Sequence, residues 1–196
     1  MPADSQPPLR VHLSQPAPEC EAEFLEAVRG SQTLHRPWAF PPANHDEFAK
    51  YLDRIQDGRT IPFLVRLDST GQLAGVVNVS EPVMGAFCSA YVGFYSLAGF
   101  ERRGYMTEGL ALVLDRAFDE LGFHRLEANI QPGNTASAAL VSRLGFRKEG
   151  FSLRYLFIDG VWRDHDRWAT LSDEWPAYRE RLFASWRADG SQSRNA

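Results

Sequence analysis

A glycine-containing, doubly basic turn constrains the fold of this 196-residue chain more than any other feature. Residues 89–95, which precede it, alternate between apolar and other side chains, as in a β-strand. After the turn, apolar side chains recur with the spacing of one α-helical face: Met106, Leu110, Val113, Leu114, Ala117, Phe118 and Leu121. Arg102, Arg103 and Gly104 at a helix start would offer an anion free N–H groups and a positive dipole end. The pattern predicts a site for a phosphate-bearing cofactor, with an ordinary basic loop as the alternative.

Two common phosphate-binding glycine motifs are absent from the sequence. The chain has no Gly-x-x-x-x-Gly-Lys-Ser/Thr loop, which excludes a nucleoside triphosphate site of that kind. It also has no Gly-x-Gly-x-x-Gly after a strand, so the dinucleotide fingerprint is missing. The segment that follows the turn is therefore needed to identify the ligand.

A second unit of strand, loop and helix is predicted within residues 124–146. Leu126, Ala128 and Ile130 line one face of its strand, and residues 131–134 then break the strand. Asn134 suits a helix N-cap, and Gly145 suits the left-handed residue that ends a helix. The other predicted elements are a strand at 9–13, helices at 19–28 and 46–55, and hairpins formed by 61–67 with 73–79 and by 155–158 with 161–168.

In their order and spacing, several motifs resemble the GNAT acyltransferase superfamily. They are residues 102–108, Asn134 with Ser137, and residues 143–146 followed by Glu149 and Gly150. Residues 159–165 and Trp175 narrow the resemblance to the RimJ/RimL-like branch, which acetylates protein N-termini. The resemblance implies one α/β domain with a twisted, mixed and mostly antiparallel sheet, flanked by helices and splayed into a V between its central strands. It also implies an N-acetyltransferase that uses acetyl-CoA.

The resemblance further implies how acetyl-CoA is held. Backbone groups around Tyr95, Ser96 and Leu97 would hold the pantetheine arm as an added strand would. Backbone N–H groups of the turn would hold the pyrophosphate, and these residues are Arg102, Arg103, Gly104, Tyr105, Met106 and Thr107. A Cβ at Gly104 would stand between the backbone and the phosphate oxygens. The turn departs from the family's usual residues at Glu101, at Arg102 (where glycine is usual) and at Met106, and the Glu101 side chain is expected to turn outward.

Ser137 and Glu81 are the candidate catalytic residues. Asn134 would hydrogen-bond the pantetheine arm as well as cap its helix, and Ser137 would face the departing sulfur and donate to the developing thiolate. Many family members offer a tyrosine farther along this helix, where this chain has Val141. Glu81 would act on the amine through a water. The alternatives are a serine on the helix surface and a solvated loop carboxylate.

The expected acceptor is a peptide or protein N-terminal amine. Its α-amino group has a pKa of about 7.7–8.0, against about 10.4 for a lysine side chain, and the sequence offers no convincing buried base. Trp38 and Phe40, in a proline-rich loop, are expected either to form a wall of the acceptor cleft or to close the core beneath the loop. A small-molecule amine acetyltransferase and a non-catalytic acyl-CoA-binding sensor remain alternatives.

Composition sets further expectations. A net charge of −4 without a basic stripe disfavours a nucleic-acid partner, and the lack of a recognisable signal or membrane-spanning segment predicts a cytoplasmic protein. Cys20 and Cys88 lie in no metal or carrier motif, which predicts direct transfer in a ternary complex. The five histidines lack metal spacing, and His165 is expected to be a satisfied or solvated group. We expect one domain at 9–187 and flexible tails at 1–8 and 188–196, and we leave a homodimer open.

Overall fold

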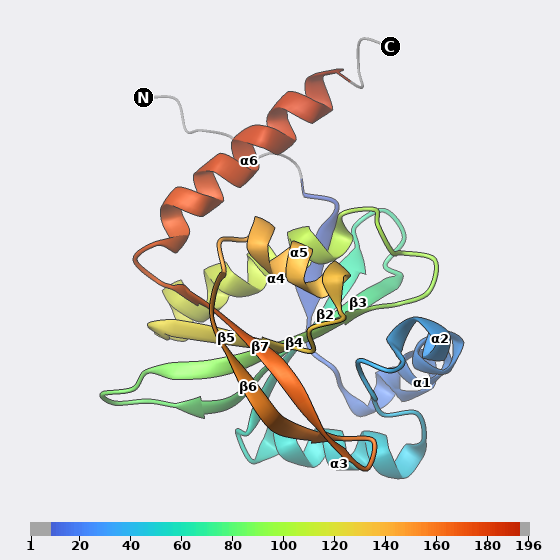
Figure 1. The fold of residues 1–196 in the computed structure, drawn as a ribbon. Coiled ribbons are helices and arrows are strands. Elements are labelled where there is room, and N and C mark those ends of the chain that lie inside the picture. The colour runs from blue at the N-terminus through green and yellow to red at the C-terminus, as the bar shows by residue number, and fades with distance from the viewer. Residues whose placement is uncertain (1–8, 193–196) are drawn as a thin grey trace.

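The computed structural model describes residues 9–192 and folds them around one seven-stranded sheet, in the order β1-β2-β3-β4-β5-β7-β6 (Figure 1). Neighbouring strands are antiparallel except β4 and β5, which run parallel. The strands are β1 Val11–Ser14, β2 Thr60–Leu67, β3 Leu73–Val83, β4 Ser89–Ser96, β5 Arg125–Ile130, β6 Arg147–Ile158 and β7 Val161–Leu171. This mixed, mostly antiparallel sheet confirms the expected fold class.

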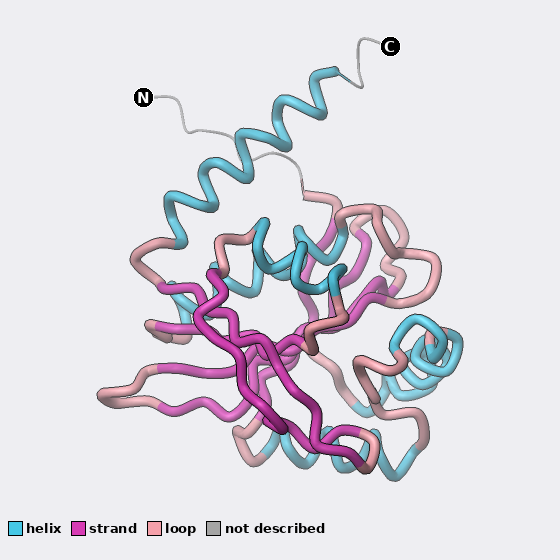
Figure 2. The backbone as a smooth tube through the Cα atoms, in the orientation of Figure 1, coloured by secondary structure: helices cyan, strands magenta, loops and turns pink. Residues whose placement is uncertain are grey.

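Helices cover both faces of the sheet (Figures 1 and 2). One face carries the 3-10 turn η1 Pro18–Cys20 and the helices α1 Glu21–Gly30, α2 Gln32–His35 and α3 His45–Gln56. The other carries α4 Tyr105–Asp115, which continues into the π-helical turn η2 Arg116–Glu120, and α5 Thr135–Arg143. Leu114 and Leu126 belong to the core under α4 and α5, whereas Phe24 and Leu64 belong to the core under α1 and α3. The sheet therefore separates two apolar layers.

The predicted strands and helices are present, with some longer ends and two further helices. β6 already begins at Arg147, whereas the sequence predicts a strand from 155. The first four residues of β6 are charged or glycine, and the alternation of Phe151, Leu153 and Tyr155 with Ser152 and Arg154 marks the earlier strand, although Phe151 and Leu153 are exposed. The sequence does not predict the single-turn helix α2 or the helix α6 Trp175–Gln192. The expected C-terminal tail begins at 188, but α6 continues to Gln192; the tail at 1–8 and residues 193–196 lie outside the described residues.

The parallel strands β4 and β5 pair only where they begin. Three register pairs join them: Ser89 with Arg125, Ala90 with Leu126, and Tyr91 with Glu127. Beyond Tyr91, β4 continues beside β3 and β5 continues beside β7, so the two strands part within a continuous sheet. Main-chain N–H and C=O groups that face the gap have no partner on a neighbouring strand there, so they require a hydrogen-bond partner of another kind. The gap is the expected V-shaped splay, and it gives an extended ligand a place to bind.

Candidate active site

The turn between β4 and α4 presents a run of free backbone donors. Gly104 caps α4 in the left-handed conformation (φ 86°), and its carbonyl oxygen accepts from the N–H groups of Thr107 (2.9 Å) and Glu108 (3.1 Å). The N–H groups of residues 101–106 find no acceptor among the residues that the structure describes. Together with the positive end of the helix dipole, these donors form an anion site that fits a pyrophosphate.

Two charged residues of this turn, Arg102 and Glu101, are fixed in different ways, one by its backbone angle and the other by a side-chain hydrogen bond. Arg102 adopts φ 59°, in the left-handed region that favours glycine, which gives a physical reason for the glycine usual at this position. The Glu101 carboxylate folds back onto the turn and accepts from the Gly99 N–H through Oε2 (2.8 Å). Glu101 is thus engaged by the turn's own backbone.

An ion pair that the sequence does not predict fixes the same turn. Glu108, 6% exposed in the first turn of α4, accepts from the backbone N–H (2.8 Å) and the Nε (2.7 Å) of Arg10. The Arg10 guanidinium also donates to the Arg103 carbonyl oxygen (2.8 Å) and lies over the Tyr105 ring. The partners are 98 residues apart in the chain. The sequence held one signal for this pair. Glu108 is an acidic residue beside an expected anion site, and such a residue requires a cation nearby.

On the β4 side of the gap, some of the expected pantetheine contacts are already engaged. The Leu97 N–H donates to the Ala74 carbonyl oxygen of β3 (2.9 Å), and the Ser96 carbonyl oxygen contacts His35 Nε2 (2.8 Å). Main-chain groups alternate in direction along a strand, so the N–H groups of Phe94 and Ser96 point away from β3, toward the gap. Of the expected contacts at 95–97, the Ser96 N–H is therefore the donor directed into the gap.

On the β5 side, α5 begins with two residues expected to contact the cofactor. Asn134 caps the helix, because its Oδ1 accepts the Ser137 N–H (3.1 Å), and its Nδ2 stays available to a ligand. Ser137 is half-buried, and its hydroxyl has no hydrogen-bond partner in the described part of the chain. Val141 is fully buried in the core. Ser137 therefore remains the candidate proton donor of this helix.

A cavity of about 340 Å³ opens beside β4, on the face of the sheet that carries α3. Its walls come from residues 39–42 and from α3, and its floor comes from β2, β3 and β4. Phe40 lines the cavity, whereas the Trp38 ring lies 2.9 Å from the place of a Cβ added to Gly133. The aromatic loop thus reaches from the cavity to the loop that follows β5, as a wall of an acceptor cleft would.

Tyr95 reaches the cavity with an unpaired hydroxyl. The phenol oxygen is buried and has no hydrogen-bond partner among the described residues. Burial, with a smaller effect of Tyr51, raises the pKa of Tyr95 well above its usual value, so the phenol stays neutral. Its ring packs against His35, whose pKa is lowered by burial despite the opposing effect of its hydrogen bond to Ser96. A neutral hydroxyl that can donate and accept therefore stands next to the gap.

Glu81 lies near the rim of this cavity. Its Oε1 accepts from Arg59 (2.9 Å) and from Arg54 (3.3 Å), and the Glu81 side chain is 44% exposed. Arg54 itself lines the cavity. Because two guanidinium groups share Oε1, Oε2 is the oxygen left for the water-mediated role expected of Glu81.

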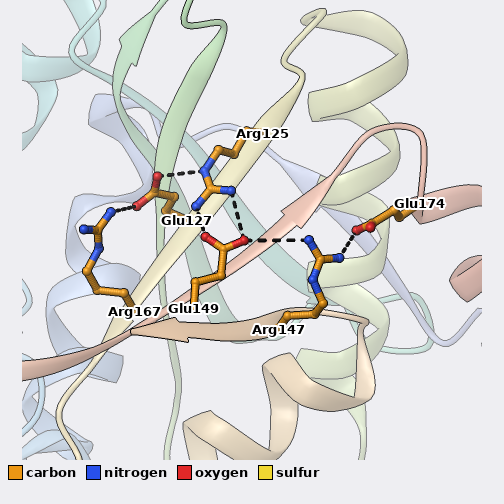
Figure 3. Close-up of polar contacts among 6 residues, drawn as sticks. All are labelled: Arg125, Glu127, Arg147, Glu149, Arg167 and Glu174. Carbon is orange, nitrogen blue, oxygen red and sulfur yellow. Dashed lines mark hydrogen bonds and ion pairs between the residues drawn. The ribbon is translucent and has the colours of Figure 1, made fainter. Parts of the chain in front are cut away.

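A chain of ion pairs supports the closed end of the V (Figure 3). Glu127, 5% exposed, accepts from Arg125 Nε (2.8 Å) and from Arg167 Nη2 (3.0 Å). Burial raises the pKa of Glu127, but hydrogen bonds and charges of Arg125 and Arg167 outweigh burial and hold it below its usual value. From Arg125 the chain continues through Glu149 and Arg147 to Glu174. Sequence reasoning missed this network because its members come from separate strands and a distant loop.

The sequence also set expectations for metal ligands, for the two cysteines, for His165 and for membrane-spanning segments. Within residues 9–192, no group of three or more His, Cys, Asp or Glu is placed to hold a metal ion, and Cys20 and Cys88 are free. His165 is buried, its Nδ1 contacts the Arg163 carbonyl oxygen (3.0 Å), and burial lowers its pKa. It is thus a core histidine with its Nδ1 bonded to the main chain, and not a solvated group. Of the helices that the structure describes, none has the length and apolar character to cross a membrane.

Sequence comparisons agree with this geometry. Residues 10–147 match the family model of the acetyltransferase (GNAT) domain. The chain is 34% identical over 125 residues to the probable N-acetyltransferase YjcK of Bacillus subtilis, which covers 64% of this chain and 69% of that protein. It is 38% identical over 104 residues to the [ribosomal protein uS5]-alanine N-acetyltransferase of Escherichia coli, which covers 53% of this chain and 54% of that protein. The match thus spans about half the length of the second relative.

Solved structures share the fold over most of the chain. Mycobacterium smegmatis RimJ in complex with CoA-disulfide matches with a TM-score of 0.79 at 30% identity, over 89% of this chain and 88% of that chain. Vibrio cholerae spermidine N-acetyltransferase in complex with CoA and spermine matches with a TM-score of 0.72 at 20% identity, over 85% of this chain and 98% of that chain. The second likeness concerns the fold alone.

Proposed function

The chain belongs to the acetyltransferase (GNAT) domain family and is an acyl-CoA-dependent acetyltransferase, and we propose that its acceptor is the α-amine of a peptide or protein N-terminus. The acyl donor is acetyl-CoA. In this proposal, the free backbone N–H groups of residues 102–106 hold the pyrophosphate, whereas the expected donor at Thr107 is already bonded to the Gly104 carbonyl oxygen. The Ser96 N–H holds the pantetheine arm from one side of the gap. Asn134 holds that arm from the other side, and transfer is direct within a ternary complex.

The charge of the cavity beside β4 carries the choice of acceptor. Lys50 and Arg54 contribute positive charge to its lining, and Glu47 is the one carboxylate found there among the described residues. Glu47 also accepts a hydrogen bond from the Ala43 N–H (2.8 Å). An acceptor with several ammonium groups, such as a polyamine, would meet like charges here. The lining therefore favours a single amine followed by neutral or acidic groups, and the name of the Escherichia coli relative supports a protein acceptor.

The protonation of the acceptor supports the same choice. At pH 7 it costs about 1 kcal/mol to deprotonate an α-ammonium group of pKa about 7.7–8.0, and roughly 4–5 kcal/mol for a lysine at about 10.4. The exposed, ion-paired Glu81 suits the first task better than the second. The neutral amine then needs alignment, which a fixed cleft supplies.

A competition between acceptors tests this function. At pH 7 we expect a short peptide with a free N-terminus to have a kcat/KM about 100-fold above that of the same peptide N-blocked but carrying one lysine, because far less lysine amine is neutral. Spermidine is expected to be the poorer acceptor as well. Thiol release from acetyl-CoA measures all three rates, with an N-blocked, lysine-free peptide as background. Faster transfer to the lysine peptide would contradict the proposal, and tight acetyl-CoA binding without thiol release would instead establish a sensor.

Ser137→Ala tests the proposed proton donor. We expect kcat to fall by about 10–100-fold with little change in KM for acetyl-CoA, because the hydroxyl acts on charge that develops during transfer. The matched control is Ser142→Ala, at an exposed position of α5, which should keep full activity. Equal activity of both variants would assign Ser137 to the helix surface.

A further inference from the structure

Two half-buried side-chain amides at the end of β5 each have one buried atom without a hydrogen-bond partner among the described residues. They are the Oδ1 of Asn129 and the Nε2 of Gln131, and no described residue bonds to either atom. Buried polar atoms are nearly always hydrogen-bonded in native folds, so two such atoms at one site require an explanation. A ligand that bonds to both would supply it.

Strand alternation puts both amides on the face of the sheet that carries the cavity. Glu127 and Asn129 lie opposite the residues of β5 that pack into the core under α4 and α5, namely Leu126, Ala128 and Ile130, and Gln131 continues this alternation directly after the strand ends. Glu127 pairs in register with Tyr91, and Tyr95 lies farther along β4 on the face of Tyr91. Because the strands part after this pair, Asn129 and Gln131 stand across the gap from Tyr95, whose hydroxyl is also unpaired among the described residues.

The two amides offer one acceptor and one donor. Residues two apart in a strand are separated by about 7 Å, so the two side chains can contact successive groups of an extended chain. A peptide supplies a matching N–H and C=O, whereas a polyamine supplies N–H donors and would leave Gln131 Nε2 unpaired. Flipping both amides together exchanges the donor and the acceptor but keeps one of each, because every side-chain amide carries both kinds of atom.

We propose that Asn129 and Gln131 bind the first peptide groups of the acceptor and so make the enzyme select peptides over simple amines. This inference rests on the proposed function and adds its means of recognition. Both residues position the chain that follows the amine and do not contact the reacting atoms. Trp38, packed at Gly133 just beyond Gln131, closes the cleft at this end.

Asn129→Leu and Gln131→Met test the inference, since each replaces an amide by an apolar side chain of similar size. The acceptors are a short peptide with N-terminal alanine and isopropylamine, which keeps the amine and methyl groups but has no carbonyl. We expect each variant to lower kcat/KM for the peptide by about 10–100-fold, mainly through KM, because a buried hydrogen bond is lost. Transfer to isopropylamine, assayed at pH 9, and the Kd for acetyl-CoA should not change.

Thr170→Val is the matched control. Thr170 Oγ1 is also buried and unpaired among the described residues, but Thr170 is the register partner of core-facing Leu126 and so lies on the opposite face of the sheet. This variant should leave both acceptors unaffected. Unchanged peptide kinetics in both amide variants would overturn the inference, as would an equal loss with isopropylamine or in Thr170→Val. A weaker Kd for acetyl-CoA would also overturn it, by assigning the amides to the donor. If the wild-type enzyme acetylates no peptide, the proposed function fails on its own, before any variant is compared.

Discussion

Gly104→Val is expected to weaken acetyl-CoA binding by more than about 100-fold, which corresponds to about 2.7 kcal/mol. The native φ of 86° is strained for any residue with a Cβ, and that Cβ would lie 3.0 Å from Arg10 Nη2. The branched side chain would also cover the backbone donors at the start of α4. Losing two hydrogen bonds to a charged ligand, at about 1.5–3 kcal/mol each, accounts for the effect. Calorimetric titration with acetyl-CoA measures it.

Gly71→Val is a control that separates the loss of acetyl-CoA binding from the effect of backbone strain. Gly71 has a similar φ of 72°, in the turn between β2 and β3, and a Cβ there meets nothing within 4 Å. This variant should lose stability comparably to Gly104→Val but retain its affinity for acetyl-CoA. Thermal unfolding verifies that both proteins are folded. Wild-type affinity in Gly104→Val would show that the pyrophosphate binds elsewhere.

Local patterns were sufficient to predict most of the fold. The strand β4, the turn and α4 follow from residues that are adjacent in sequence, as do β5 and α5 with the cap at Asn134. Helix α6 does have a local signal, because apolar side chains recur in it with helical spacing and pack on the core: Trp175, Tyr178, Leu182, Phe183 and Trp186. The position of α6 depends on long-range contacts: the Trp175 indole donates to Asp115 (2.7 Å), and Arg179 binds the same carboxylate. Single-sequence periodicity carries no information on such contacts.

The same distinction applies to the candidate site. The free N–H groups of the turn were predictable because the first turn of a helix leaves its backbone donors unpaired whatever surrounds it. The Arg10–Glu108 ion pair could not be predicted, because no local sequence rule joins Arg10, directly before β1, to Glu108 in the first turn of α4. The unpaired amide atoms of Asn129 and Gln131 could not be predicted either, because whether a buried polar atom has a partner depends on the residues packed around it in the fold.

Arg125→Met is expected to lower the free energy of unfolding by about 2–4 kcal/mol at pH 7. Arg125 bonds to both Glu127 and Glu149, so its loss leaves the buried Glu127 carboxylate with Arg167 as its remaining cation (Figure 3). A buried charge that loses a partner is costly, whereas an exposed pair contributes little. Urea unfolding followed by circular dichroism measures the difference from the wild type.

The pH dependence of this loss identifies its cause. The pKa of Glu149 is lowered chiefly by its hydrogen bond from Arg125, and the Arg125 and Arg167 guanidinium groups together overcome burial to lower that of Glu127. A carboxylate with a lowered folded-state pKa contributes stability above its unfolded pKa of about 4.3 and loses it as pH falls through the folded value. The gap between wild type and Arg125→Met should therefore be constant from about pH 6 to 8 and narrow below about pH 4. The control Arg59→Met breaks an exposed pair with Glu81 and should cost about 0–1 kcal/mol. A gap that persists unchanged at pH 3 would attribute the loss to the packing of the Arg125 stem.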